Sequence, residues 1–526
     1  SDTEVLLNMF IEFGSSMLNM LNGIFSFAIF NKKNKQLFIA RDHFGVKPLY
    51  FYNNDSFFAF ASEIKALLIH PKVNFKVNQN KLEEYVVLQI PMGRETFYDQ
   101  IYKLEPGHFM TINNGKITSE KQYWDLKYEI DETKTEEEFS RELLLLLQNS
   151  TTLQARSDVP VGTYLSGGLD SSIVSILTAK NYTNHIKTFT GGFKISKEYD
   201  ETIFAKAVAE KIKSEYHEVF PTHIDFIENF ENLVYHMDEP AGGPGIFPQF
   251  MVSKLASNHV KVVLGGHGGD ELFGGYARYS IAYLEESLKG AILGDNNDNY
   301  VVNLESIIEN LPSLKQYIPL LKRQFSNGFF GEMNQRYFNL INRSFSLNKI
   351  YSKDFIESIN IENIFSKFDN IFSKPDTSSL FNKMTYFDLK TLLPALLQVE
   401  DRVSMAVSIE SRVPLLDRRV AELSAKMPPV MKFSGGELKS ILLKSTKDIL
   451  PKIISNRRDK MGFPTPLNEW MKGPLKEYIM DIFLSNQSHQ RGLYRVDNIE
   501  KQLKSEGKFS RDLWGLLNLE LWHRMN

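Results

Sequence analysis

Hydrophobic and polar residues follow two different patterns along the chain. Up to about residue 125, short runs rich in Phe, Ile and Tyr alternate with turn signals. Strands are predicted at Phe25–Phe30, Gln36–Ala40 and Leu49–Tyr52, with turns at residues 31–34 and 53–55. Because strands joined by such short turns pair in opposite directions, this part of the chain predicts antiparallel sheets.

From about residue 135 the apolar positions take up helical spacing. A helix is predicted at residues 136–150, a strand at Val161–Leu165 and a second helix at Ser172–Lys180. Strands that alternate with helices indicate a parallel sheet. The stretch from about 280 to 390 has helical periodicity without a chemical motif, so we expect packing helices there.

The change of pattern predicts two domains. The total of 526 residues exceeds the ~100–200 residues of a typical single domain. We expect an α+β domain with antiparallel sheets at residues 1–125, and an α/β domain with a parallel sheet and extra helices at residues 126–526.

The composition of the chain excludes several classes of protein. The chain has no cysteine, which excludes disulfides, thiolate metal sites and a cysteine nucleophile within this sequence. A net charge of −3 gives no overall attraction to nucleic acid or to an anionic membrane. No apolar run approaches the ~18 residues of a membrane helix, and the first residues lack the features of a signal peptide. We expect a cytoplasmic enzyme with small-molecule substrates.

The first glycine-rich segment lies between the predicted strand and helix and has the sequence SGGLDSS at residues 166–172. Glycines allow a tight turn whose N–H groups point at an anion, serines add hydroxyl donors, and the helix N-terminus adds partial positive charge. We expect a phosphate site here, with Asp170 either capping the helix or holding a metal ion. An ordinary helix-capping turn is the alternative.

A second glycine-rich segment, GGHGGDELFGG at residues 265–275, follows the apolar strand predicted at residues 262–264. Its six glycines indicate close approach of the backbone to a ligand. An acid at each of two strand ends can hold Mg²⁺ between phosphate oxygens, so Asp170 and Asp270 are the candidate metal ligands. A flexible hinge with a capping Asp is the alternative for this segment.

Together with further segments, these loops resemble the glutamine-dependent asparagine synthetases, in particular the asparagine synthetase B-like amidotransferases. The resemblance covers most of the chain and includes SDTEV (1–5), NGIFSFA (22–28), RDHFGVKPLY (41–50), FASEIKAL (60–67), DRVSMA (401–406), ESRVPLLD (410–417) and GFPTP (462–466). It implies an N-terminal-nucleophile glutaminase domain, truncated in this sequence, followed by an ATP-pyrophosphatase domain of the adenine nucleotide alpha-hydrolase type.

The resemblance also implies roles for individual residues. Asp2 sits where the family binds the glutamine amino group, and Lys439 sits where a family lysine lies near the reacting phosphate. Without the resemblance, Lys439 would be predicted as a solvated helix lysine. Contacts to ATP and pyrophosphate are implied for Leu165, Ser166, Gly167, Gly168, Asp170, Ser171, Ser172, Gly191, Gly265 and Gly266.

The implied reaction uses ATP and Mg²⁺. A substrate carboxylate attacks the α-phosphate and releases pyrophosphate, and the adenylate then loses AMP to ammonia. In the family, ammonia comes from glutamine, which an N-terminal cysteine hydrolyses with its own α-amine as base. Because this sequence has no cysteine, we expect that it is truncated and that the intact protein begins with Met-Cys. Use of free ammonia is the alternative. The family often forms homodimers.

Two departures from the family leave the acceptor open. His267 stands where asparagine synthetases usually carry a glutamate that handles the incoming ammonia. A histidine there could act as a general base, or could simply pack in the turn. Residues 238–245 also differ from the usual loop. Aspartate is the expected acceptor, and another carboxylate, such as a sugar uronate in surface-polysaccharide synthesis, is the alternative.

Other functions explain less of the sequence. A transfer-RNA thiolation enzyme would need cysteines and a basic face, and a ligase of the argininosuccinate or guanylate type would not explain the segments of the first domain. A β-lactam-forming relative would keep both domains and differ in substrate. An inactive regulatory or scaffold protein would have no need of a complete pyrophosphate loop.

Overall fold

The computed structural model describes residues 1–54, 57–182, 185–240, 242–294, 302–326, 328–344, 347–458, 462, 464–505 and 511–526, which separate into two compact units. The first unit comprises Ser1–Leu82 and Met92–Lys127, and the second comprises Glu83–Pro91 and Tyr128–Asn526. Asp55 of a predicted turn, Ala241 of the divergent 238–245 loop and Phe463 of a family segment lie outside the described residues. Within the described ranges, no helix is long and apolar enough to cross a membrane.

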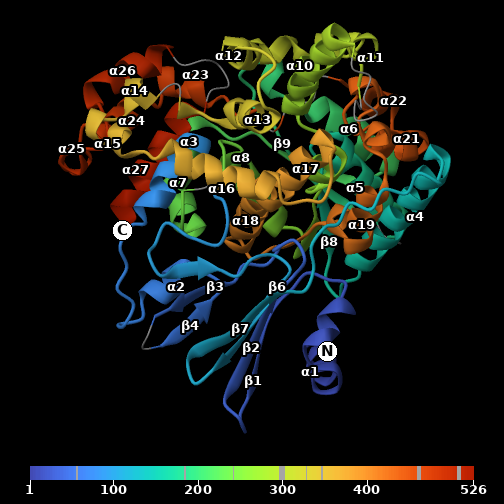
Figure 1. The fold of residues 1–526 in the computed structure, drawn as a ribbon, viewed down its shortest axis with the longest axis horizontal. Helices are drawn as coiled ribbons and strands as arrows, with labels where there is room; N and C mark the ends of the chain where they lie inside the picture. Colours follow the sequence, from blue (N-terminus) through green and yellow to red (C-terminus); the bar gives the residue numbers. More distant parts are fainter. Residues whose placement is uncertain are drawn as a thin grey trace. The chain divides into compact units, whose positions relative to one another are not determined.

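The first unit is built on antiparallel sheets, as the sequence predicts (Figure 1). In its described residues, one sheet has the strand order β1-β2-β6-β7 and the other β4-β3-β5. Ile39 and Met110 of the first sheet share a buried cluster with Phe51 of the second, so the sheets enclose a common core. The strands span Ser26–Asn31 (β1), Gln36–Arg41 (β2), Tyr50–Asn53 (β3), Phe58–Ala61 (β4), Ile101–Lys103 (β5), His108–Asn113 (β6) and Lys116–Gln122 (β7). The helices span Asp2–Phe13 (α1), Ile64–Leu68 (α2) and, across the border between the units, Gln79–Leu88 (α3).

The second unit contains the predicted parallel sheet. Its described strands lie in the order β10-β9-β8-β11-β12, and each pairs with its neighbours in parallel. They span Val161–Tyr164 (β8), Lys187–Gly191 (β9), Glu215–Val219 (β10), Val262–Leu264 (β11) and Glu410–Arg412 (β12). The chain moves outward from β8 through β9 to β10, and then returns to place β11 on the other side of β8. The carboxyl ends of β8 and β11 therefore meet where the strand order reverses, the usual ligand position in such sheets.

Helices cover this sheet in two groups. α5 (Leu169–Lys180) and α6 (Thr202–Ile212) follow β8 and β9 and pack against each other. α7 (His223–Met237), α8 (Ile246–Ser257) and α18 (Leu392–Met405) form a second mutually packed group, with α8 lying against β9 and β10. The predicted helix at 136–150 is α4 (Glu136–Gln154), which begins at a capping box between Thr135 and Glu138.

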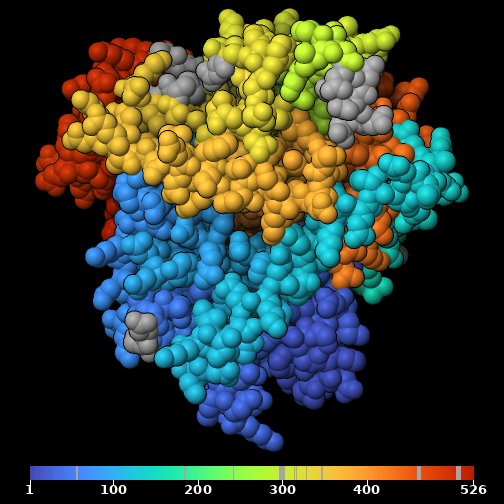
Figure 2. All heavy atoms as spheres, viewed as in Figure 1, coloured from blue at the N-terminus to red at the C-terminus, as the bar shows by residue number. Residues whose placement is uncertain are grey.

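The region from about 280 to 390 is helical, as predicted. Its atoms, yellow to orange in Figure 2, form a continuous part of the surface of the second unit. Its helices are α10 (Ala277–Leu293), α11 (Leu304–Ile308), α12 (Ile318–Ser326), α13 (Met333–Ile341), α14 (Leu347–Ile350), α15 (Lys353–Ser358), α16 (Ile361–Phe372) and α17 (Leu380–Lys390). The other helices of this unit are α9 (Gly269–Phe273), α19 (Arg418–Lys426), α20 (Pro429–Lys432), α21 (Ser440–Thr446), α22 (Lys452–Ser455), α23 (Leu467–Lys472), α24 (Lys476–Phe483), α25 (Asn486–Arg491), α26 (Val496–Ser505) and α27 (Asp512–Met525).

A buried carboxylate holds three helices of this region together through an ion pair and a hydrogen bond. Glu285 of α10 accepts hydrogen bonds from Arg336 Nε at 3.0 Å and Nη2 at 2.7 Å, and from Gln324 Nε2 of α12 at 3.1 Å. Both charged side chains are almost completely buried. Because a buried charge is costly unless it is neutralised, the carboxylate of Glu285 fixes the position of α13 on α10.

We expect Glu285→Gln to lower the free energy of unfolding by about 3–5 kcal/mol, because it leaves the guanidinium of Arg336 buried without its carboxylate. The matched control is Glu357→Gln, which breaks an exposed pair with Lys353 at 3.5 Å and should cost about 0–1 kcal/mol. Urea denaturation of both variants measures the difference. Equal losses of stability would contradict this role for Glu285.

Candidate active site

Hydrogen bonds between its own serines stabilise the turn between β8 and α5. Ser166 donates its backbone N–H to Ser171 Oγ at 3.2 Å, and the two hydroxyls lie 3.0 Å apart. Gly167 has a φ of 71°, and a Cβ there would lie 2.5 Å from Phe204 Cβ and 2.7 Å from the backbone nitrogen of Ala205. Glycine is therefore required, because a side chain would be strained and would collide with α6.

Helix α5 begins earlier than predicted, and this changes the role of Asp170. The helix starts at Leu169 rather than Ser172, and its N-cap is Gly168, which supplies no side-chain hydrogen bond. Asp170 therefore lies in the first turn, so the prediction that it caps the helix is wrong. Ser172 is fully buried, and within the described residues its hydroxyl makes no hydrogen bond. The start of α5 thus offers N–H groups and hydroxyls without a capping side chain, as an anion site requires.

Lys439 joins the two carboxylates that follow β8 and β11. Its Nζ lies 2.5 Å from Asp170 Oδ2 and 2.6 Å from Asp270 Oδ1. Lys439 directly precedes α21, with a positive φ of 57°, and its side chain is 11% exposed. It is therefore a buried lysine at a helix start rather than a solvated helix lysine.

Opposing effects act on the charge of Lys439. Burial favours the neutral amine, but the carboxylates of Asp170 and Asp270 together outweigh burial and raise its pKa. The ammonium is thus charged throughout the physiological pH range. Nearby, burial and the charge of Asp270 raise the pKa of Glu271 to about 8, and Tyr276 donates a hydrogen bond to this carboxyl group.

Two glycines permit this close arrangement. A Cβ on Gly266 would lie 2.7 Å from the backbone nitrogen of Ser171 and 2.9 Å from the carbonyl carbon of Asp170. A Cβ on Gly275 would overlap Asp270 Oδ1 and Lys439 Cε. The second glycine-rich segment therefore packs its backbone directly on the first turn of α5. A set of two carboxylates on such a backbone fits Mg²⁺, which prefers oxygen ligands.

His267 lies beside a buried carboxylate that the sequence did not single out. Its Nδ1 is 3.7 Å from Glu400 Oε2, and the imidazole is 24% exposed. Glu400, on α18, is buried and accepts hydrogen bonds from Gln249 of α8 and Ser411 of β12. This negative charge adds to burial in raising the pKa of Tyr164. The signal that could have identified it is its place directly before the family segment DRVSMA at 401–406, at the end of the apolar run that begins α18.

A small pocket lies beside the first glycine-rich turn. Ser166, Gly191, Tyr199, Glu201 and Pro464 line it. Gly191 ends β9, the strand on which Phe189 accepts a hydrogen bond from Leu165 N at 2.9 Å. Leu165 and Gly191, both predicted to contact ATP, are thus held on adjacent strand ends.

Arg457 is a further residue of this region that sequence reasoning missed. Its guanidinium stacks on Phe204 at 3.7 Å from the ring centroid, donates to Gly167 O at 3.3 Å and forms an ion pair with Glu201. The sequence around it carries no signal of this contact, because its partners are more than 250 positions away.

Asp2 belongs to the first unit, whereas every other predicted site residue belongs to the second. It is exposed at the first position of α1, and its carboxylate accepts a hydrogen bond from Thr3 N at 2.7 Å. Its role in binding glutamine stays a prediction. Arg402 pairs with Asp238 at 3.2 Å and Arg412 with Glu410 at 2.7 Å.

We expect Gly266→Ala to lower the free energy of unfolding by about 1–3 kcal/mol, because the new methyl group meets backbone atoms that cannot move aside. The adjacent Gly265→Ala is the matched control, since its nearest neighbour is a side-chain atom, His267 Nδ1, at 3.3 Å. Thermal unfolding without nucleotide compares the two. Similar stability of both variants would show that the two glycine-rich segments are not packed as described.

Comparison with known proteins agrees with this arrangement. Residues 142–524 match the family model described as asparagine synthase, and residues 1–124 match the glutamine amidotransferase domain. The glutamine-hydrolyzing asparagine synthetase 1 of Bacillus subtilis (strain 168) is 30% identical over 100% of this chain and 81% of its own length. A putative glutamine-hydrolyzing asparagine synthetase of Mycobacterium tuberculosis (strain ATCC 25618 / H37Rv) is 29% identical over 99% of this chain and 79% of its own.

A third relative carries a different name. The amidase chry2 of Gibberella zeae is 25% identical over 97% of this chain and 79% of its own length. The first unit of the structure corresponds to the amidotransferase match and the second to the synthase match. The chain therefore belongs to the glutamine-hydrolysing asparagine synthetase family, whose members are ligases.

Proposed function

We propose that this chain amidates aspartate through an aspartyl adenylate, with asparagine as the product. Its family catalyses ATP-dependent, glutamine-dependent amidation, which supports the reaction type. The single observation that carries the proposed chemistry is the meeting of Lys439, Asp170 and Asp270 at the carboxyl ends of β8 and β11. A buried ammonium between two strand ends is suited to the charge of a departing pyrophosphate.

The proposed reaction has two steps. A carboxylate oxygen attacks the α-phosphorus of ATP, the bond between the α-phosphorus and its bridging oxygen breaks, and pyrophosphate leaves with the electron pair. Ammonia then attacks the carbonyl carbon of the adenylate, loses a proton, and displaces AMP. The protein's part is to hold the reactants in line and to offset developing charge.

The chain's own groups supply the charge compensation. The N-terminus of α5 and the hydroxyls of Ser166, Ser171 and Ser172 would hold the pyrophosphate oxygens. Lys439 would exchange its contact with the two carboxylates for a contact with the leaving group. Asp170 and Asp270 would hold Mg²⁺, which when bound neutralises charge on the phosphate oxygens.

His267 is the proposed base for the second step. Its imidazole can take the proton that ammonia loses, and the carboxylate of Glu400 would stabilise the resulting imidazolium. The hydrogen bonds from Gln249 and Ser411 hold Glu400 in place for this role.

Pyrophosphate release from ATP and Mg²⁺, with ammonium as the nitrogen source, tests the proposed function. We expect release to depend on aspartate and asparagine to form. Lys439→Met should lower the rate by about 10²–10³-fold, because charge on the leaving group loses its partner. Lys444→Met is the matched control. This lysine lies on α21, the helix that Lys439 directly precedes, in an exposed pair with Glu136, and its loss should leave the rate near that of the unaltered chain.

Other outcomes have distinct meanings. Release that requires a different carboxylic acid would keep the adenylation step and reassign the acceptor. Absence of pyrophosphate release with every acid would favour an inactive regulatory or scaffold protein. Equal rates for the two lysine variants would contradict the role proposed for Lys439.

A second candidate acceptor is another carboxylate, such as a sugar uronate. His267 replaces the glutamate usual in asparagine synthetases, and the amidase name of chry2 lends this alternative support. The panel of acids in the same assay should therefore include sugar uronates.

We expect His267→Gln to lower the rate of amide formation by about 10²-fold while ATP–pyrophosphate exchange continues, because the proton is removed after adenylation. His223→Gln, at the start of α7, serves as the control. Loss of exchange in parallel with amide formation would contradict the assignment of His267 to the second step.

A further inference from the structure

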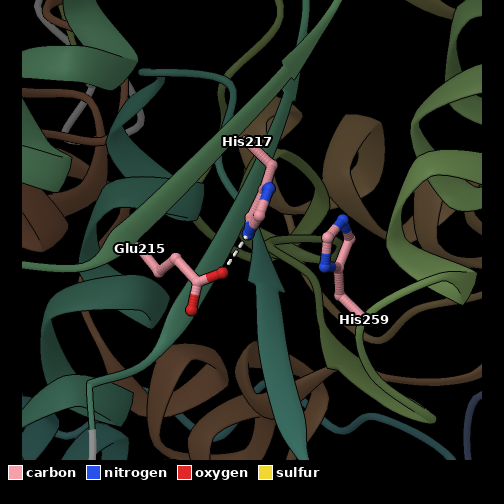
Figure 3. A group of neighbouring side chains, drawn as sticks. All are labelled: Glu215, His217 and His259. Carbon is pink, nitrogen blue, oxygen red and sulfur yellow. Dashed lines mark hydrogen bonds and ion pairs between the residues drawn. The ribbon is translucent and has the colours of Figure 1, made fainter.

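A group of side chains that the proposed reaction does not use lies at the amino ends of the strands of the parallel sheet. Glu215 is the first residue of β10, and His217 follows two positions later on the same strand. His259 comes from the loop between α8 and β11. Figure 3 shows the three side chains gathered at this end of the sheet, with His217 between the other two. The site lies at the amino ends of the strands, whereas Lys439 lies at the carboxyl ends.

The donor atoms of the three residues converge. One ligand atom from each side chain lies within 4.8 Å of the other two. His217 Nε2 is 2.9 Å from Glu215 Oε1, and the two imidazole centroids are 4.0 Å apart. Within the described residues, neither ring nitrogen of His259 has a hydrogen-bond partner. A lone pair on His259 is thus available beside an imidazole and a carboxylate.

The backbone and a buried ring hold these donors in place. Residues two apart on a strand point to the same face, which explains why Glu215 and His217 lie together. Phe189, opposite His217 in the register of β9 and β10, stacks on its ring at 5.3 Å and lies 5.9 Å from the ring of His259. Phe189 also belongs to a core cluster with Val260, which fixes the loop that carries His259.

An ordinary polar surface is the competing interpretation. Lys187 Nζ lies 3.4 Å from Glu215 Oε1, so the carboxylate already has a positive neighbour. This pair is partly exposed, and such pairs contribute little to stability. The pair of Lys187 and Glu215 does not explain why two imidazoles lie with their centroids 4.0 Å apart. A cation bound by both imidazoles would stabilise this arrangement more than the contact between the two rings does.

We propose that Glu215, His217 and His259 bind one first-row divalent transition metal ion, with Zn²⁺ as the best-suited member of the class. Two imidazoles and one carboxylate are a donor set that zinc sites use, with a water completing four-fold coordination. Binding would replace the contact between His217 Nε2 and Glu215 Oε1 with bonds from both groups to the metal ion, and would link β10 to the loop before β11. This proposal is independent of the acceptor and of the adenylation chemistry.

Titration with Co²⁺ in excess Mg²⁺ tests the site, because Mg²⁺ occupies sites made of oxygen ligands and Co²⁺ reports imidazole ligands through its visible absorption. We expect one Co²⁺ per chain, displaced by Zn²⁺. His259→Gln should weaken binding at least about 10–100-fold, since it removes a direct ligand. His489→Gln, an exposed histidine on α25, is the matched control and should bind like the unaltered chain.

A variant that is expected to bind the metal ion more tightly shows whether weaker binding in the histidine variant results from misfolding. Lys187→Gln removes the positive neighbour of Glu215 and should tighten binding several-fold. Zn²⁺ should also raise the unfolding temperature of the unaltered chain and not that of His217→Gln/His259→Gln, because an ion that binds the folded state stabilises it. Absence of saturable Co²⁺ binding, or binding that survives in the double variant, would overturn the proposal.

Discussion

The site depends on one charge balance: a buried ammonium neutralises two carboxylates that reach it from different strand ends. Without Lys439, Asp170 and Asp270 would lie near each other as like charges, and Asp170, whose side chain is only 15% exposed, would be the less solvated of the two. The same lysine supplies a positive charge where a phosphate-bearing substrate would bind. Stability of the free protein and charge compensation in the reaction therefore rest on the same three groups.

The topology of the sheet creates this meeting point. The strand order reverses between β8 and β11, so the loops that follow these two strands lie side by side at the carboxyl edge. The glycines of the second loop let its backbone touch the first turn of α5, and Gly275 leaves room for Asp270 and Lys439. Each loop is short and tightly packed, which restricts the freedom of the groups that would bind phosphate.

The sequence predicted much of this, and its failures have physical causes. Strands and helices with clear periodicity, such as β2, α4 and β8, were predicted correctly. The two glycine-rich segments lie together in the structure, and their role as a phosphate site stays a prediction. The start of α5 was placed three residues late because Gly168, which has no capping side chain, ends the turn. Glu400 and Arg457 were missed because their contacts join positions far apart in the chain, which periodicity does not reveal. The boundary at residue 125 stays a prediction.

The adenylate is the central claim, and the fate of the carboxylate oxygen tests it most directly. Aspartate labelled with ¹⁸O in its side-chain carboxylate would be incubated with ATP, Mg²⁺ and ammonium, and the phosphorus products analysed by mass spectrometry. Adenylation predicts one ¹⁸O in each AMP and none in pyrophosphate, because the attacking oxygen stays on the α-phosphorus. Label in inorganic phosphate, with ADP as the nucleotide product, would contradict the account, since it would place the attack on the γ-phosphorus.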